Sequence, residues 1–257
     1  ARTQRTALET GVKLALLPKK TRGAMVHGEI AIQFGTLASL KSQRVVASAV
    51  ARMLLRGTKT KSRQQVKDLF DQLKAHVSVS PQPQAAIVSF EVKRENLKPL
   101  VDLLFDCLKN PAFNEAEFEA LRREQVAFAE SKKDDPSALG MTALQRALAE
   151  FDKSHPFYVP TWPEIIADAK SMRVDQLKAF HGKFYGSGVA LVALVGDFDA
   201  TEVTLLIEGH TRGFRSAEKY EEIVVQFAPS KVDRSVIDTP DKAMAFFGVG
   251  STFRLKD

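Results

Sequence analysis

The sequence is poor in the residues and patterns that indicate disulfide, metal or membrane chemistry. Among its 257 residues there is a single cysteine, Cys107, so the chain forms no internal disulfide. No two of the five histidines lie close enough for the HxH or HxxxH spacings of zinc sites. The longest apolar stretch without charge, about residues 185–196, is shorter than the about 18 to 20 residues that cross a bilayer. We therefore expect no short-spaced metal motif and no membrane span.

The isolated candidate residues favour packing over chemistry. His27 and Glu29 share the polar face of one strand pattern and offer at most two metal ligands, so we interpret them as a solvent-facing pair. His181 lies among aromatic residues, where a packed, hydrogen-bonded imidazole is expected. Cys107 falls on the apolar side of a helical pattern, without the exposure or neighbouring base that a nucleophile needs. Since GxSxG, GxGxxG and phosphate-loop motifs are also missing, the residues alone indicate a packed domain without an active site.

The excess of positive charge is dispersed along the chain. The net charge is +6, from 37 basic and 31 acidic residues, and the isoelectric point is near 9.3, which raises the question of nucleic acid. The densest basic stretch, residues 56–63 (RGTKTKSR), contains no aromatic residue that would stack on a base. We interpret this stretch as a solvated loop and expect no nucleic-acid partner. A nucleic-acid binder would instead show a steep salt dependence of binding.

Hydrophobic periodicity divides the chain into short strands and helices. Asn96 is expected to cap one helix, and Asn114 with Glu117 to form a capping box for the next. Asp135 followed by Pro136 is typical of a further helix start. The expected strands are 11–18, 26–34, 77–80, 85–92 and 189–195, and the expected helices are 42–56, 62–74, 97–110, 114–132, 135–150, 163–169, 174–184 and 199–209.

The order of these elements predicts an α+β fold, in which helices are layered on one face of a mixed sheet. The apolar run 189–195 is nearly continuous and is expected to be a strand covered on both faces. Beyond Phe227 the chain is rich in proline, lysine and aspartate until a new strand pattern, 243–249, begins without an evident partner. Because the first residue is also Ala1 rather than Met, we expect a processed chain or a fragment. Its domain would be 1–225, followed at 226–257 by a linker and the first strand of a truncated following domain.

Several stretches, each weak alone, occur together in order over about residues 6–205. They are LETGVKLALLPKK, MLLRGTKTKSRQQVKDLFDQL, FNEAEFEALRREQ, DDPSAL, HPFYVPTWPEIIADAKSMRVDQLKAFHGKFY and VALVALVGDFD. As a set they resemble the insulinase-type (M16) zinc metallopeptidases. The resemblance covers most of the chain and implies the α+β fold of the LuxS/M16-type metalloenzymes.

Active members of that family carry an HxxEH motif on their first helix, directly before the segment that is MLLRGT here. Its two histidines share a helix face and bind zinc, and its glutamate acts as general base on the zinc-bound water. Here the corresponding positions hold Ser48, Ala51 and Arg52, and a guanidinium has no lone pair to give a metal. The third ligand, a glutamate, is expected at Glu130 or a neighbour. The resemblance thus implies no zinc and no catalysis in this chain, because one carboxylate does not replace a three-ligand site.

Family members are built from homologous α+β domains, four in the single-chain forms, arranged as two halves that close around an unfolded peptide. This chain resembles the third, non-catalytic domain of a long bacterial member. The resemblance implies a domain that helps to enclose peptide and supports catalytic M16 domains, which hold the zinc in the same chain or in a partner chain. The alternative is a structural or assembly subunit without a peptidase role, like the core proteins of respiratory complexes. Bacterial members are often exported, so the resemblance favours a periplasmic parent protein.

Overall fold

A mixed six-stranded sheet forms the centre of the computed structural model, which describes residues 2–231 and 234–254. Neighbouring strands follow the order β1-β2-β6-β3-β5-β4, and among the described strands only β2 and β6 pair in parallel. A parallel pair needs a long crossover, and here most of the chain lies between its two strands. The strands are β1 Gln4–Ala7, β2 Lys13–Pro18, β3 Met25–Gln33, β4 His76–Gln82, β5 Ala85–Lys93 and β6 Leu191–Gly196.

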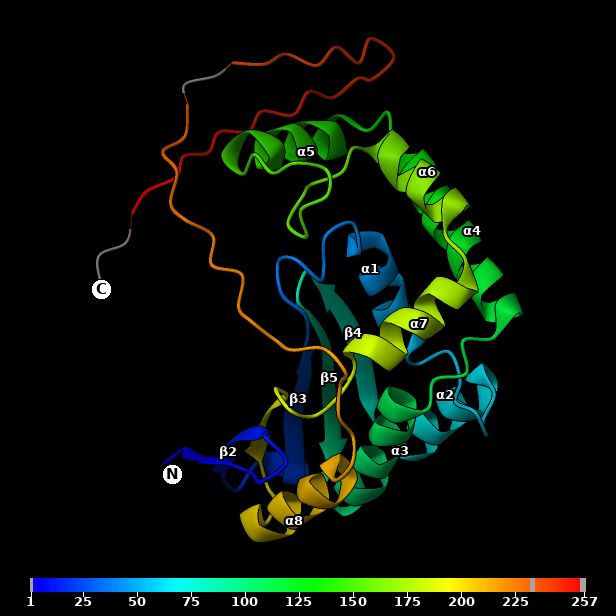
Figure 1. The fold of residues 1–257 in the computed structure, drawn as a ribbon, viewed down its shortest axis with the longest axis vertical. Coiled ribbons are helices and arrows are strands. Elements are labelled where there is room, and N and C mark those ends of the chain that lie inside the picture. The colour runs from blue at the N-terminus through cyan, green and yellow to red at the C-terminus, as the bar shows by residue number, and fades with distance from the viewer. Residues whose placement is uncertain (1, 232–233, 255–257) are drawn as a thin grey trace.

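Helices cover one face of this sheet and continue beyond it as an arc made by α4, α6 and α5 (Figure 1). Helices α1, α3, α7 and α8 contribute buried residues to the core against the sheet. No helix in the described part of the chain combines the length and the apolar character that a membrane crossing requires. The helices are α1 Arg44–Met53, α2 Arg63–Gln72, α3 Leu97–Lys109, α4 Glu115–Lys132, α5 Pro136–Leu148, α6 Trp162–Ser171, α7 Val174–Phe184 and α8 Ala200–Thr211.

The core lies on the helical side of the sheet, and the opposite face is open. Ile30 and Ile32 of β3 and Val192 of β6 point into the core and are at most 1% exposed. Because successive strand residues alternate between faces, Leu191 and Ala193 of β6 point outward, and Leu191 is 38% exposed. The expectation that 189–195 is covered on both faces is therefore wrong. The expected α+β arrangement, with helices on one face of a mixed sheet, is confirmed.

The starts of α4 and α5 follow the local signals in the sequence. Asp135 accepts a hydrogen bond from the Ala138 N–H, and α5 begins at the proline between them. Asn114 accepts hydrogen bonds from two N–H groups of the first turn of α4. The Glu117 side chain does not complete the expected capping box, since it pairs with Arg63 of α2 at 3.1 Å.

Two local predictions differ from the structure. The expected cap at Asn96 is wrong: a short 3₁₀ turn precedes α3, and the Asn96 amide donates to the Leu73 carbonyl oxygen instead. Strand β1 has no counterpart in the sequence prediction, because its four residues, QRTA, are all exposed and show no apolar alternation. Both differences depend on tertiary neighbours rather than on local sequence.

After α8 the chain continues without a helix or strand through the described residues 212–231 and 234–254 (Figure 1). Part of this segment lies along α5, where a Cβ added to Gly140 would stand 2.3 Å from the Phe246 ring. Other apolar residues here stay in solvent, and Phe247 and Val249 are 89% and 82% exposed. The strand pattern at 243–249 therefore has no partner in the described sheet. The division at residues 225 and 226 remains a prediction.

Replacement of Gly196 by alanine is expected to destabilise the fold by roughly 1 to 3 kcal/mol. Gly196 ends β6 with φ +141°, and a Cβ there would stand 2.3 Å from the Met25 carbonyl oxygen. The matched control is Gly182→Ala on α7, since no atom lies within 4 Å of that added Cβ. Urea denaturation should show a large loss for the first variant and no loss, or a small gain, for the second. Equal effects would contradict this account of Gly196.

Candidate functional site

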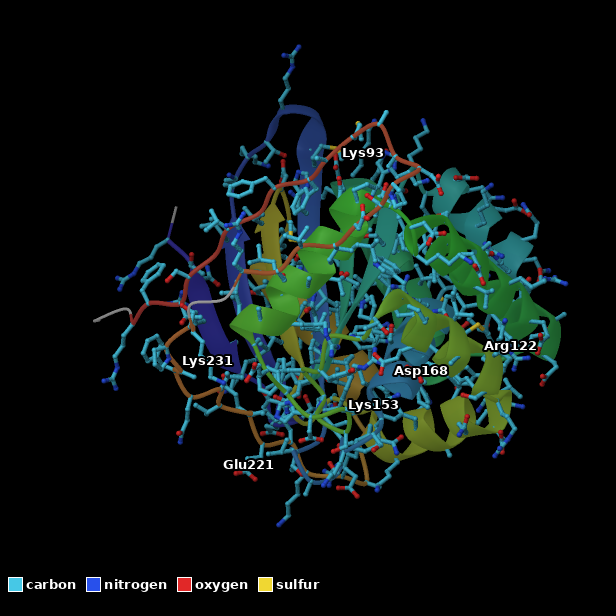
Figure 2. All side chains as sticks on the ribbon, turned by 90° about the horizontal axis from the view of Figure 1, so that it is seen from above. Lys93, Arg122, Lys153, Asp168, Glu221 and Lys231 are labelled. Carbon is cyan, nitrogen blue, oxygen red and sulfur yellow. The ribbon has the colours of Figure 1, made fainter. Side chains whose placement is uncertain are left out.

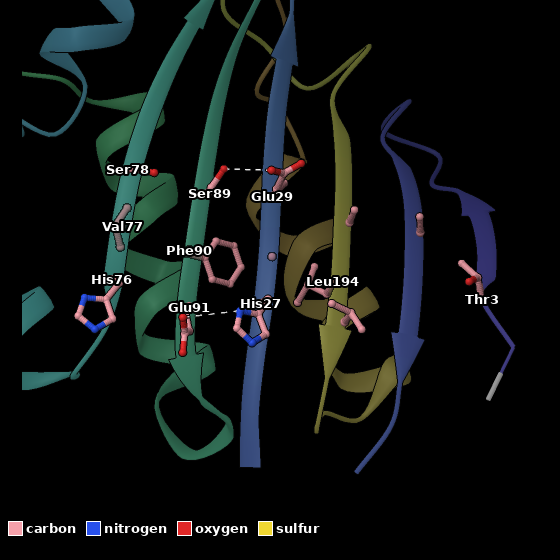
Figure 3. Close-up of a pocket in the computed structure, with 14 residues that line it drawn as sticks. Thr3, His27, Glu29, His76, Val77, Ser78, Ser89, Phe90, Glu91 and Leu194 are labelled. Atoms are coloured by element: carbon pink, nitrogen blue, oxygen red, sulfur yellow. Dashed lines mark hydrogen bonds and ion pairs between the residues drawn. The ribbon is translucent and has the colours of Figure 1, made fainter. Parts of the chain in front are cut away.

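One candidate hollow, of about 690 Å³, lies on the open face of the sheet (Figure 3). His27 and Glu29 of β3 line it, as the alternation predicts. The His27 ring lies 3.7 Å from the Glu91 carboxylate of β5, whereas Glu29 accepts a hydrogen bond from Ser89 at 3.1 Å (Figure 3). Each of the two is paired with β5, so they do not act together as a ligand pair.

The described histidines and the cysteine do not build a metal centre. His76 of β4 lies opposite Glu91 of β5 (Figure 3). Even so, residues 2–231 and 234–254 contain no group of three or more His, Cys, Asp or Glu side chains placed to hold a metal ion. His181 is packed as expected: its Nε2 is 2.8 Å from the Leu108 carbonyl oxygen, and burial lowers its pKa. Cys107 is 1% exposed, and burial raises the pKa of its thiol to about 12. Both residues therefore serve packing.

A second hollow, of about 810 Å³, lies between α1, α4, α6 and strand β4. Ser48 and Arg52, one turn apart on α1, line it, so the structure brings together two of the three positions that the resemblance assigns to HxxEH. Ala51 lies elsewhere, because it is 1% exposed and packs into the core. Glu130 is exposed, pairs with Lys133 at 2.8 Å and does not line the hollow. The residues of α4 that line it are Leu121, Glu124, Gln125 and Phe128.

Two of the three arginines that line this hollow are paired with carboxylates. Arg44 donates to Asp168 of α6 at 2.9 Å. Arg56 binds Glu124 of α4 through both terminal nitrogens, and these hydrogen bonds lower the pKa of the Glu124 carboxyl. Arg52 is exposed and has no ion pair or side-chain hydrogen bond with any residue in the described part of the chain. Among the described residues, the hollow therefore has one positive charge without a carboxylate partner, at a position that the resemblance assigns to a zinc ligand.

Helix α6, one wall of this hollow, is held by charged hydrogen bonds. Thr161 and Glu164 form a capping box at its start. Glu164 also accepts from the Tyr158 hydroxyl at 2.9 Å and pairs with Lys153 at 3.1 Å. Burial alone would raise the pKa of Glu164, but these hydrogen bonds together lower it to about 2. Lys153 also lies near Asp168 of the same helix (Figure 2), so charge fixes α6 along its length.

The outer rim of the hollow is aromatic. Phe128 of α4 and Trp162 of α6 meet edge to face, with ring centroids 6.0 Å apart. Phe128 is 58% exposed, so part of its ring is accessible at the rim. The sequence identifies Trp162 as the only tryptophan, but its partner lies on another helix and has no local signal. The rim offers an apolar surface beside the charge of Arg52.

Strand β4 brings an unpaired backbone edge to the hollow. It is the last strand of the described sheet, and Val77 and Val79 line the hollow. A two-residue turn joins β4 to β5, so its closing pair, Gln82 and Ala85, is hydrogen-bonded, and bonded and non-bonded pairs alternate from there. Val77 and Val79 fall at non-bonded positions and therefore turn their N–H and C=O groups away from β5. Pro81, which has no N–H, occupies the next such position, as this geometry requires.

The family model for insulinase (peptidase family M16) matches residues 15–152 of this chain. The match covers more than half of the chain and includes α1, with the Ser48 and Arg52 that line the hollow. The match and the α+β fold thus define a domain of the M16 type. The chain belongs to the insulinase family, peptidase family M16.

Individual relatives are distant in sequence but similar in fold. The non-peptidase homolog YmxG of Helicobacter pylori is 21% identical over 228 residues, which are 89% of this chain and 51% of that protein. An uncharacterized zinc protease of Rickettsia bellii is 24% identical over 191 residues, covering 72% of this chain and 43% of that protein. The peptidase M16 inactive domain from Pseudomonas fluorescens has a TM-score of 0.76 at 20% identity, covering 90% of this chain and 55% of that chain. The expected M16-type fold is confirmed, and the chain spans about half the length of the curated relatives it matches.

After incubation with zinc and exhaustive dialysis, the purified chain is expected to retain far less than one zinc per molecule. Ser48 and Arg52 offer no pair of metal ligands, and elemental analysis measures the retained metal. The matched variant combines Ser48→His, Arg52→His and Gln125→Glu, which places two imidazoles one turn apart beside a carboxylate of α4, and it should retain more zinc. Stoichiometric zinc on the unaltered chain would contradict the assignment.

Glu164→Gln is expected to destabilise the chain by about 1 kcal/mol at neutral pH, because a neutral amide caps α6 less well. The folded pKa of Glu164 is lowered from 4.5 to about 2, so its contribution is complete above pH 4.5 and is lost as the pH falls towards 2. Urea unfolding of both proteins across this range measures the difference. A difference between variant and unaltered chain that stays constant through this window would show that the ionised carboxylate does not hold α6.

Proposed function

We propose that this chain is a non-catalytic M16 domain that holds an extended segment of unfolded peptide. The observation that carries the proposal is the unpaired edge of β4, which opens onto a hollow whose HxxEH positions hold no metal ligands. An extended peptide gains affinity from main-chain hydrogen bonds with a strand edge and selectivity from alternate side chains that enter pockets. Here the N–H and C=O groups of Val77 and Val79 provide the edge, and the hollow provides the pocket.

The proposal assigns catalysis to other M16 domains. Those domains would hold the zinc, either in the same protein or in a partner chain, and this domain would support them and help to enclose the substrate. The chain then corresponds to the third domain of a long member, and residues 226–257 are the linker and first strand of the domain that follows. The family membership, the names of the non-peptidase and inactive relatives and the half-length coverage of the curated relatives support this assignment.

The alternative function, a structural or assembly subunit without a peptidase role, uses the same fold differently. It needs no peptide in the hollow, so the hollow would be filled or covered by an assembly partner. The free strand edge favours peptide binding, because the edge strand of the described sheet can pair with a further strand at the hollow. Copurification with a large complex that lacks a peptidase half would favour the structural alternative.

Binding of a neutral, terminally blocked peptide of alternating valine, glutamine and threonine tests the proposed function. Trp162 is the only tryptophan and lines the hollow, so its fluorescence should change on titration with such a peptide. The peptide should be bound and recovered uncleaved. No saturable fluorescence change and no binding in equilibrium dialysis would remove the basis of the proposal.

Val79→Pro should weaken this binding about three- to tenfold, because it removes one N–H group on the free edge of β4. Pro81 already occupies an equivalent position, so the pairing of β4 with β5 should persist, and circular dichroism and urea denaturation check the fold. Val79→Thr is the matched control, since it changes the side chain and keeps the N–H. If both variants bind like the unaltered chain, peptide does not add to β4.

A further inference from the structure

The geometry points to an acidic side chain, glutamate or aspartate, as the group that this hollow selects in a bound peptide. This inference deepens the proposed function and rests on it: a segment paired with β4 would place one carboxylate against Arg52. The position where active M16 members bind zinc would here bind an anion of the peptide. The selected ligand is thus an extended, acidic stretch of unfolded chain.

Of the three arginines that line the hollow, two are paired with carboxylates and one is not. Arg44 is compensated by Asp168 at 2.9 Å and Arg56 by Glu124, so neither guanidinium needs a further anion. Arg52 alone has no carboxylate within ion-pair distance among the described residues, and Ser48 beside it adds a hydroxyl that can donate a hydrogen bond. A planar guanidinium binds a carboxylate through two parallel N–H groups, which is the geometry that favours a carboxylate over a neutral amide.

The position of the hollow along β4 indicates whether the bound carboxylate belongs to a side chain or to the C-terminus of the peptide. Val77 and Val79 lie on the helical side of the sheet, so alternate residues of a peptide beside them would point into the same hollow as Arg52. The hollow adjoins residues 77–79, which lie inside β4 (His76–Gln82), so a segment paired with the whole strand would extend past the hollow at both ends. The carboxylate at this place is therefore that of a side chain rather than a peptide C-terminus. Phe128 and Trp162 favour apolar residues next to it on the same face.

A titration with three peptides tests this inference on the unaltered chain. The first is the neutral, blocked peptide described above, the second carries one central Gln→Glu change, and the third is the neutral peptide with a free C-terminal carboxylate. The Glu peptide should bind about tenfold more tightly than the neutral one at low salt, with a smaller preference at high salt. The free C-terminus should add no comparable affinity. Trp162 fluorescence is the readout.

Two variants locate the preference. Arg52→Gln should bring the affinities for the Glu and neutral peptides together, and Arg52→Lys should restore part of the difference as a point charge. Arg123→Gln is the matched control, because it removes an exposed arginine of α4 that does not line the hollow, and the preference should remain. An equal loss in Arg52→Gln and Arg123→Gln would mean that only net charge matters and would overturn the inference.

The outcomes separate this inference from the proposed function. If the unaltered chain binds the Glu and neutral peptides equally, and Val79→Pro still weakens both, selection of an acidic side chain is wrong and peptide binding at β4 stands. If tighter binding follows the free C-terminus instead of the glutamate, the inferred ligand is also wrong. If none of the peptides binds, the proposed function fails together with the inference.

Discussion

The packing of α1 against β4 and α7 is the constraint on which the hollow depends. Ala49, Val50 and Met53 are fully buried on one face of α1, and burial of an apolar side chain the size of valine or methionine contributes roughly 1.5 to 3 kcal/mol. This packing fixes the rotation of the helix and leaves Ser48 and Arg52 on its opposite, hollow-facing side. The scaffold and the site thus use different faces of one helix. Metal ligands can therefore be replaced at positions 48 and 52 without loss of the core.

Charged contacts connect the walls opposite α1 to the rest of the fold. Helix α6 has a single buried residue, Ala169, and is held through Glu164 and Asp168 to partners outside the helix. Arg56, which follows the end of α1, pairs in the same way with Glu124 on α4. The carboxylates of Asp168 and Glu124 pair with Arg44 and Arg56, so these wall residues compensate each other's charge. Among the described residues that line the hollow, Arg52 is the remaining charge. The electrostatic character of the site therefore follows from how its walls are held.

The parts of the fold that the sequence predicts are those governed by local periodicity. The helix at 174–184 has the predicted bounds, and β3 and β5 differ from prediction by a residue or so at each end, because their apolar residues repeat at the period of the element. The two-sided burial of β6 was a wrong prediction for a physical reason. The sequence shows that both faces of the strand carry apolar residues, but an apolar residue such as Leu191 can still be exposed to solvent. Composition alone therefore does not show whether another element covers the outer face.

The site was predictable only in part, because its members come from distant segments. The resemblance indicated Ser48, Ala51 and Arg52, but it could not show that Ala51 turns into the core. Among the described residues Arg52 has no carboxylate partner, because tertiary packing pairs Asp168 with Arg44 and Glu124 with Arg56. The free edge of β4 likewise follows from strand order, and only Pro81 gives a local sign of it. Pairing partners across the fold are the information that one sequence does not contain.

Zinc catalysis and peptide holding make different demands on this scaffold. Catalysis needs metal ligands at specified distances, so the loss of a single ligand removes it. Peptide holding needs a strand edge and a shaped wall, and these depend on the sheet order and on the buried face of α1, which carries neither Ser48 nor Arg52. A domain of this family can therefore lose the first property and keep the second. In a domain without metal ligands, the surface of α1 that faces the hollow can carry a charge such as that of Arg52, which the proposed acidic peptide would neutralise.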